Sequence, residues 1–224
     1  MPEEQGERPL GIFGGTFDPV HCGHLRLAEE AADHLRLAAV RWIPAGQPLL
    51  RAAPQVSARH RLAMVRLATA GNPGFEVDAA EVDAAQASYT VLTLERLRQA
   101  NQPGKRRPLV LLLGADAFAA LPDWHRWQSL LELAHIGVAH RPGFPIDVGK
   151  LPEALAACYR ERWCTQPAAL HESAAGRIAT FAMTPLGISA TQIRTLLASG
   201  SSPRYLLPDE VIAYIRKHNL YPEY

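Results

Sequence analysis

A glycine-rich turn between an apolar run and an amphipathic run constrains the fold of this chain most strongly. The apolar run Leu10–Phe13 leads directly into Gly14–His24, and an amphipathic stretch, Leu25–Leu37, follows. A strand, a glycine turn and a helix in this order direct backbone N–H groups and the positive end of a helix dipole at a bound anion. The turn also contains His21 and His24, whose imidazoles can donate hydrogen bonds to anionic oxygens. The sequence therefore predicts a nucleotide-phosphate site in an α/β fold.

Short apolar, β-prone runs alternate with longer amphipathic ones, which is the pattern of βα units around a parallel sheet. The expected strands are Leu10–Phe13, Ala39–Ile43, Phe75–Val77, Leu109–Leu113, Ile136–Ala139 and Ile178–Phe181. The expected helices are Leu25–Leu35, Ala58–Thr69, Thr90–Gln99, Trp124–Leu133, Pro152–Arg160, Ala190–Ala198 and Pro208–His218, and the expected loops are Pro142–Pro152 and Gln166–Gly176. We expect a single doubly wound, Rossmann-like parallel sheet with helices on both faces. One domain would cover residues 1–224, with a C-terminal helical extension over residues 188–224.

Composition narrows the class of protein. The 224 residues carry a net charge of +1 and 48% of them are hydrophobic, so the chain has the apolar content of a globular domain and no basic surface for nucleic acid. The segment Met1–Pro9 is polar and acidic, and no uninterrupted apolar stretch approaches membrane-spanning length. The three cysteines, Cys22, Cys158 and Cys164, follow no disulfide framework. We expect a cytoplasmic protein with no nucleic-acid or membrane partner.

Ligands of open parallel sheets bind beyond the carboxyl ends of the strands, and the polar motifs of this chain fall there. Besides the first turn, these motifs are Gly114-Ala115-Asp116, His140-Arg141-Pro142-Gly143 and Ile188-Ser189-Ala190-Thr191-Gln192-Ile193-Arg194. The P-loop pattern Gly-x-x-x-x-Gly-Lys-Ser/Thr and the dinucleotide pattern Gly-x-Gly-x-x-Gly are both absent from the sequence. Other groups are therefore expected to bind the phosphate.

The two histidines of the first turn have competing interpretations. In an isolated His-x-x-His motif, one histidine more often caps the turn while the other is simply exposed. A metal site would need a third and a fourth ligand, and none stands at a recognisable spacing. The setting within Gly14–His24, with the Thr16 hydroxyl just ahead, favours phosphate binding. Cys22 either has a lowered pKa beside the histidines or is a buried, inert thiol.

The other motifs also have structural alternatives. Ser189 either caps a helix or binds phosphate, and Arg194 either points along the same face or is solvated. Asp116 either accepts hydrogen bonds from a ribose or caps the next helix. Trp124 either stacks on an aromatic ring or belongs to the core. Ser88-Tyr89-Thr90 offers hydroxyl and backbone donors, and its alternative is a plain N-cap.

Taken together, these residues resemble the nucleotidyltransferase superfamily with the His-x-Gly-His motif. More closely, the chain resembles the bacterial nicotinate-nucleotide adenylyltransferase family over nearly its whole length. The resemblance is carried by Gly14–His24, Ile43-Pro44, Ser88-Tyr89-Thr90, Gly114-Ala115-Asp116, Leu121-Pro122-Asp123-Trp124, His140-Arg141-Pro142-Gly143 and Ile188–Arg194. It implies transfer of AMP from ATP to nicotinate mononucleotide with Mg²⁺, giving nicotinate adenine dinucleotide and pyrophosphate in NAD biosynthesis.

The resemblance also implies roles for individual residues. The catalytic residues would be His21, His24 and Arg194. ATP would be bound by Gly14, Gly15, Thr16, Phe17, His21, Gly23, His24, Gly114, Asp116, Ile188, Ser189 and Arg194. The mononucleotide would be bound by Tyr89, Thr90, Trp124, His125, Arg141 and Arg51. Its nicotinate ring would stack on Trp124, and its carboxylate would meet backbone donors near Thr90 and His125. No protein metal site is implied, because Mg²⁺ would be held mainly by the ATP phosphates.

The chain departs from the family pattern at two positions. After the second strand it reads Gln47-Pro48-Leu49-Leu50-Arg51, where the family often has Pro-Pro-His-Lys/Arg, so only Arg51 is carried over. His125 stands where relatives commonly have tyrosine, so a backbone contact survives and a phenol contact does not. The alternatives are another nucleotidyltransferase, acting on pantetheine phosphate or glycerol phosphate, and a nucleotide-binding regulator without turnover. The sequence carries no signal for an oligomeric state.

Overall fold

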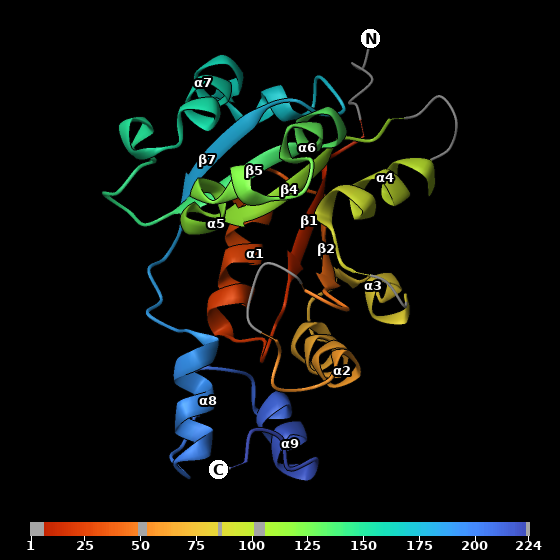
Figure 1. Cartoon of the computed structure of the whole chain (residues 1–224), viewed down its shortest axis with the longest axis vertical. Helices are drawn as coiled ribbons and strands as arrows, with labels where there is room; N and C mark the ends of the chain where they lie inside the picture. The colour runs from red at the N-terminus through yellow and green to blue at the C-terminus, as the bar shows by residue number, and fades with distance from the viewer. Residues whose placement is uncertain (1–6, 49–52, 85–86, 101–105, 223–224) are drawn as a thin grey trace. The chain divides into compact units, whose positions relative to one another are not determined.

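The computed structural model describes residues 7–48, 53–84, 87–100 and 106–222 (Figure 1). Within these residues lies a seven-stranded sheet of order β3-β2-β1-β4-β5-β7-β6. Its strands are β1 (Leu10–Gly15), β2 (Ala39–Pro44), β3 (Phe75–Val77), β4 (Leu109–Gly114), β5 (His135–His140), β6 (Trp163–Cys164) and β7 (Ile178–Ala182). The pairs β1–β4, β4–β5, β5–β7 and β6–β7 are parallel. The expected doubly wound, Rossmann-like sheet is confirmed, and its strand order reverses between β1 and β4.

The helices alternate with the strands as expected. Those of the described residues are α1 (Cys22–His34), α2 (Ala58–Thr69), α3 (Ala80–Asp83), α4 (Thr90–Ala100), α5 (Ala115–Ala119), α6 (Trp127–Leu133), α7 (Glu153–Arg162), α8 (Ala190–Ala198) and α9 (Asp209–Lys217), with short 3₁₀ turns at Leu121–Asp123, Val148–Lys150 and Pro167–Leu170. None of the helices in the described ranges is both long and apolar enough to cross a membrane. Each expected strand and helix is present, although several boundaries differ.

Some expected boundaries and loops were wrong. The helix expected from Trp124 begins at Trp127, because Trp124 is extended and Arg126 adopts a left-handed conformation with φ of 52°. The segments Pro142–Pro152 and Gln166–Gly176 are not loops throughout, since each contains a 3₁₀ turn. The short elements α3, α5 and β6 were not expected, because two to five residues are too few to show a hydrophobic period.

The chain divides into two compact units. Unit 1 comprises Met1–Phe13, Ala28–Arg41 and Tyr89–Thr184, and unit 2 comprises Gly14–Leu27, Trp42–Ser88 and Pro185–Tyr224. Unit 1 is built on β4, β5 and β7, which lie side by side in Figure 1. Its fully buried residues include Val110, Leu112, Ile136, Val138 and Ile178, and those of unit 2 include Trp42, Met64, Val65, Ile193 and Ile215. That residues 1–224 act as one domain stays a prediction.

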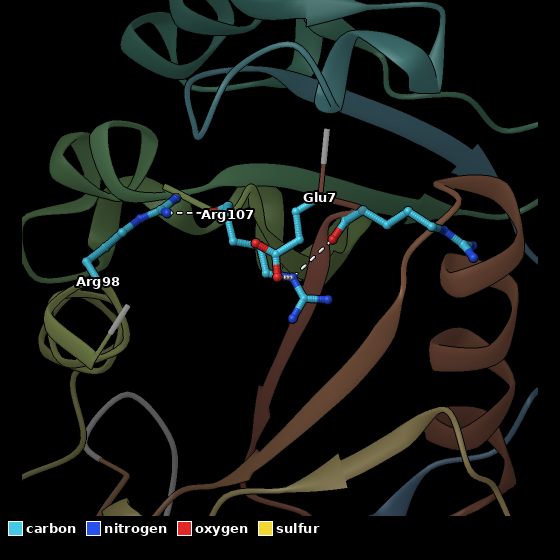
Figure 2. A network of polar contacts seen from close by, with 4 residues as sticks. Glu7, Arg98 and Arg107 are labelled. Atoms are coloured by element: carbon cyan, nitrogen blue, oxygen red, sulfur yellow. Dashed lines mark hydrogen bonds and ion pairs between the residues drawn. The ribbon is translucent and has the colours of Figure 1, made fainter. Parts of the chain in front are cut away.

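Arg98 ties three segments of unit 1 together through their backbone, and its contact with Arg107 is drawn in Figure 2. Its Nε, Nη1 and Nη2 atoms donate to the carbonyl oxygens of Leu133, Arg107 and Ala174 at 2.7, 2.6 and 2.7 Å. Burial lowers the pKa of Arg98 to about 10, so the guanidinium stays charged at neutral pH. Arg107 in turn forms an ion pair with Glu7, 3.7 Å from Nε to Oε1. Arg98 is therefore a structural residue of unit 1.

Candidate active site

The two histidines of the first turn lie against each other in unit 2. Their rings stack with centroids 3.7 Å apart and an interplanar angle of 28°. The backbone N–H of His21 donates to Nδ1 of His24 at 3.2 Å. Because Nδ1 accepts this bond, the neutral ring of His24 carries its proton on Nε2, which is then the donor of the ring. The turn thus fixes the tautomer that can donate to a phosphate oxygen.

His21 is a buried, neutral member of this pair. It is 7% exposed, and burial lowers its pKa to about 4. Its Nδ1 atom is buried and has no hydrogen-bond partner among the described residues. A buried polar atom without a partner costs free energy, so it is the kind of atom that a ligand satisfies. The structure also shows no group of three His, Cys, Asp or Glu side chains in its described ranges that could hold a metal ion.

Phe17 supports the histidines from inside unit 2. Its side chain is 2% exposed, and its ring meets that of His24 edge-on, with centroids 5.1 Å apart. An added Cβ on Gly15 would lie 2.8 Å from the Phe17 ring, and one on Gly23 would lie 3.0 Å from His21 Nδ1. These two glycines are therefore needed for close packing around the aromatic rings. Because the Phe17 ring is buried, a contact from this residue to ATP would come from its backbone.

Gly14 has a different reason to be glycine. An added Cβ there would meet no protein atom closer than the Ile43 carbonyl oxygen at 4.0 Å, and its backbone is not left-handed. The residue is exposed at the end of β1. Neither packing nor backbone conformation demands a glycine here, so the space beside it suits the close approach of a ligand to the main chain.

Helix α8 brings a cationic group, the Arg194 guanidinium, to the same turn within unit 2. Ser189 accepts the Gln192 N–H at 3.1 Å, which confirms that it caps the helix. Arg194 is not solvated: its Nη1 donates to the carbonyl oxygen of Asp18 at 2.7 Å and its Nη2 to Thr191 Oγ1 at 3.2 Å. Its Nε is buried without a partner in the described part of the chain. An added Cβ on Gly23 would lie 3.7 Å from the Ile188 carbonyl oxygen, so the segment before α8 also adjoins the turn.

Sequence analysis missed the roles of three buried residues around this turn, which are Asp18, Arg61 and Tyr221. Asp18 is 7% exposed and accepts the hydroxyl of Tyr221 on Oδ1 at 2.7 Å. Arg61 is 1% exposed and donates to the carbonyl oxygen of Thr16 at 2.6 Å and to that of Gly46 at 3.0 Å. A signal existed for Arg61, which stands beside Leu62 on the buried face of α2, where an apolar residue is usual.

Cys22 begins α1 but has no sign of an activated thiol. Its sulfur is half-buried, and desolvation raises its pKa above the ordinary value. The alternative of a lowered pKa is therefore not supported by the surroundings of this thiol.

In unit 1, the residues after β4 are open to a ligand. Gly114 is the N-cap of α5, without a side-chain capping bond, and Asp116 is exposed in the first turn of that helix. The alternative that Asp116 caps the helix is therefore wrong. An added Cβ on Gly114 would meet nothing within 4 Å, and its φ is −77°. As with Gly14, the fold itself does not demand this glycine.

Tyr89 and His125 come together at the start of α4 in unit 1. Their ring centroids are 4.7 Å apart at an interplanar angle of 44°. The carbonyl oxygen of Tyr89 accepts the N–H groups of Leu92 and Thr93, so the helix begins at Thr90. An ion pair of 2.8 Å between Arg126 and Glu95 fixes the turn after His125 to α4.

The remaining expected residues differ in how well they are fixed. Trp124 is half-buried and extended, so it is not a fully buried core residue. Arg141 is exposed, and its carbonyl oxygen accepts the Phe144 N–H at 3.0 Å in a turn where Gly143 has φ of 78°. In unit 2, Ser88 Oγ accepts the N–H groups of Gly46 and Gln47, at 2.9 and 3.2 Å. Arg51 lies outside the described residues.

Comparison with known proteins shows the family of this chain. Residues 12–196 match the family model described as cytidylyltransferase-like. A protein of Dechloromonas aromatica named probable nicotinate-nucleotide adenylyltransferase is 59% identical over 213 residues, 95% of this chain and 97% of that protein. A protein of the same name from Hahella chejuensis is 45% identical over 219 residues, 97% of each chain.

Solved structures confirm the fold. Nicotinic acid mononucleotide adenylyltransferase from Plasmodium falciparum, complexed with NaAD, superposes with a TM-score of 0.70 at 16% identity, over 96% of this chain and 98% of that one. A putative nicotinate-nucleotide adenylyltransferase from Vibrio parahaemolyticus superposes with a TM-score of 0.62 at 13% identity, over 96% and 95%. At these identities, the likeness shows the shared architecture.

Proposed function

Because this chain belongs to the nicotinate-nucleotide adenylyltransferase family, we propose that it transfers the AMP group of ATP to nicotinate mononucleotide. The products are nicotinate adenine dinucleotide and pyrophosphate, which makes the reaction a step of NAD biosynthesis. Two buried polar atoms around one turn, Nδ1 of His21 and Nε of Arg194, carry the proposal, because neither has a partner among the described residues. An anionic ligand would supply the missing acceptors and charge.

The chemistry suits a site without a general base. The phosphate of a mononucleotide is already anionic at neutral pH, so it can attack the α-phosphorus without losing a proton. The barrier comes mainly from repulsion between anions and from in-line alignment, so positioning and charge neutralisation dominate. His24 as a donor, Arg194 as a fixed cation and the start of α1 supply these functions. Loss of one preorganised donor of this kind costs roughly two to three powers of ten in rate.

Mg²⁺ is proposed to enter with ATP. Magnesium prefers oxygen ligands in octahedral geometry, and the carboxylate at the first turn, that of Asp18, already accepts a hydrogen bond on each of its oxygens. In the described ranges, no three His, Cys, Asp or Glu side chains gather where they could hold a metal ion. The ATP phosphates are then its ligands, and the residues of the chain act on the phosphate oxygens directly.

The acceptor is proposed to bind through unit 1. Its nicotinate ring would stack on Trp124, and its carboxylate would meet the first amides of α4, next to Thr90 and His125. The positive end of a helix dipole favours such a carboxylate. Asp116 is exposed in the first turn of α5, as a ribose-binding carboxylate needs to be. We also propose a cytoplasmic location, which suits the free thiols of Cys22, Cys158 and Cys164.

One assay separates this function from its alternatives. The purified protein is incubated with ATP, Mg²⁺ and, in turn, nicotinate mononucleotide, pantetheine phosphate or glycerol phosphate, and pyrophosphate is measured. We expect release with nicotinate mononucleotide. Release only with another acceptor would assign a different nucleotidyltransferase, and ATP binding without release in any mixture would assign a regulator. A parallel set with CTP in place of ATP covers a cytidylyltransferase.

A further inference from the structure

Asp18 joins three separate segments of unit 2. Its Oδ1 accepts the hydroxyl of Tyr221 at 2.7 Å, and its Oδ2 accepts the backbone N–H of Gln55 at 2.8 Å. Its main-chain carbonyl oxygen accepts Nη1 of Arg194 at 2.7 Å. Both carboxylate oxygens and the carbonyl oxygen of this residue are therefore bound, each by a different part of the chain. The residue is 7% exposed, so water screens these bonds little.

Tyr221 is the most distant of these partners in sequence. It follows α9, is 4% exposed and has a left-handed backbone with φ of 57°. Burial raises the pKa of its hydroxyl, and the charge of Asp18 raises it further, so the group stays protonated and remains a donor at every pH of interest. The single proton of this hydroxyl is donated in the hydrogen bond to the Asp18 carboxylate.

These contacts determine where the Arg194 guanidinium lies. Of its nitrogen atoms, Nη1 is held by the Asp18 carbonyl and Nη2 by Thr191 on its own helix, while Nε is buried without a partner in the described residues. The bond to Asp18 is thus the link from this guanidinium to the first turn. Any shift of Asp18 moves the acceptor of that link.

We propose that Tyr221 and Asp18 are positioning residues that hold the Arg194 guanidinium for its action on the ATP phosphates. Tyr221 fixes the Asp18 carboxylate, and Asp18 fixes Arg194 through its carbonyl oxygen. Neither residue is required to touch the substrate. The segment after α9, which contains Tyr221, would then support catalysis by positioning Arg194. The inference rests on the proposed adenylyl transfer, which supplies the role of Arg194.

A double-mutant cycle tests the coupling between Tyr221 and Arg194. The Tyr221→Phe variant, the Arg194→Ala variant and the double variant are compared with the wild-type protein for kcat and for KM with each substrate. We expect Tyr221→Phe to lower kcat/KM for ATP roughly tenfold, the usual scale for a hydrogen bond to a buried charge. KM for nicotinate mononucleotide should stay within about twofold. In the Arg194→Ala background, Tyr221→Phe should have almost no further effect.

A merely structural role of Tyr221 predicts different results. The effect of Tyr221→Phe would then be the same in both backgrounds, and that additivity would overturn the proposal, as would wild-type kinetics of Tyr221→Phe. Tyr214→Phe is the matched control, because it removes a hydroxyl of α9 that contacts His60 Nδ1 at 3.0 Å on α2. We expect this control to keep wild-type kinetics.

Two further measurements test the positioning role independently of the kinetic cycle. Asp18→Asn keeps an oxygen acceptor for Tyr221, so it should lose less activity than Asp18→Ala. Equal losses of activity would contradict the proposed link from Tyr221 through Asp18 to Arg194. ATP affinity by calorimetry for the same four proteins gives a cycle that needs no turnover. An inactive wild-type protein would refute the proposed function, whereas an active one with an additive cycle in both readouts would refute the positioning role alone.

Discussion

The backbone N–H of His21 donates a hydrogen bond to Nδ1 of His24 at 3.2 Å, within the turn that leads into α1. This bond fixes the ring of His24 with its proton on Nε2. The stacked ring of His21 and the edge of Phe17 restrict the same ring further. The ring of His24, the proposed phosphate donor, is therefore preorganised by its own turn before any ligand binds.

His24→Ala should lower kcat about a hundredfold or more, because it removes a fixed donor to a phosphate oxygen. His24→Gln, whose amide N–H can reach the position of Nε2, should recover part of the loss. Pyrophosphate release measures the rate, and circular dichroism checks that the variants are folded. His34→Ala, at the exposed end of the same helix, serves as the control. Near-normal release by folded His24→Ala would refute its catalytic role.

The burial of His21 predicts a pH-dependent stability. Its pKa is about 4 in the folded protein against an ordinary value of 6.5. Between these values the unfolded chain binds more protons than the native one, so the free energy of unfolding falls as the pH falls from 6.5 to 4 and is unaffected above 6.5. Over this pH range, the protonation of His21 changes the free energy of unfolding by about 3 kcal/mol.

Guanidinium unfolding of the wild-type protein and of His21→Asn, at a series of pH values, measures this contribution. Burial also lowers the pKa of His135. Because His135 is present in both proteins, the difference between their free energies of unfolding reports on His21 alone. We expect the difference in the free energy of unfolding between the two proteins to change between pH 4 and 6.5 and to be constant above 6.5. Parallel curves over the whole range would show that His21 is not desolvated.

The expected strands were predictable because a parallel strand buried on both faces carries a continuous apolar run, as Leu109–Leu113 does. The helices α2 and α8 were predicted to the residue, since Ser57 and Ser189 are strong N-caps whose bonds the structure contains. The left-handed conformation of Arg126 moved the start of α6, and no local signal marks an arginine for that conformation.

The site was predictable only where a motif is contiguous. Gly14–His24 and Ile188–Arg194 are each continuous in sequence, so their residues could be named. The partners that hold them are not: Arg61 and Tyr221 reach the turn through tertiary contacts from α2 and from the segment after α9. Asp18 lies inside the motif, but its role depends on Tyr221 and so could not be read from the motif itself.

Glycine substitutions should separate ligand contact from packing. Gly14→Ala and Gly114→Ala add a methyl group where the protein leaves space, so stability should change little while KM for ATP rises. Gly15→Ala places a Cβ 2.8 Å from the Phe17 ring, so overpacking should lower the free energy of unfolding by about 1–3 kcal/mol and the melting temperature with it. Thermal unfolding and ATP kinetics are measured for all three. An unchanged KM for Gly14→Ala and Gly114→Ala would mean that ATP does not approach these positions.

Arg98→Met should destabilise the protein without a direct effect on catalysis. The substitution leaves three backbone carbonyl oxygens without their donor, and an unsatisfied buried acceptor costs about 1–3 kcal/mol. Since Arg98 is partly exposed, the lower end is expected. Denaturant unfolding measures the loss, with Gln99→Ala, exposed on the same helix, as control. A stability equal to that of the control would contradict the structural role.

The acceptor site should prefer a carboxylate to an amide on the pyridine ring. Charge-assisted hydrogen bonds to the first amides of α4 would raise kcat/KM for nicotinate over nicotinamide mononucleotide by about ten- to a hundredfold. Thr90→Pro removes an N–H at the first position of α4, where proline is tolerated, and should reduce this preference. Thr90→Ala keeps that N–H and should preserve it. A preference for the amide in the wild-type protein, or the same ratio in Thr90→Pro, would show that these amides do not bind the carboxylate.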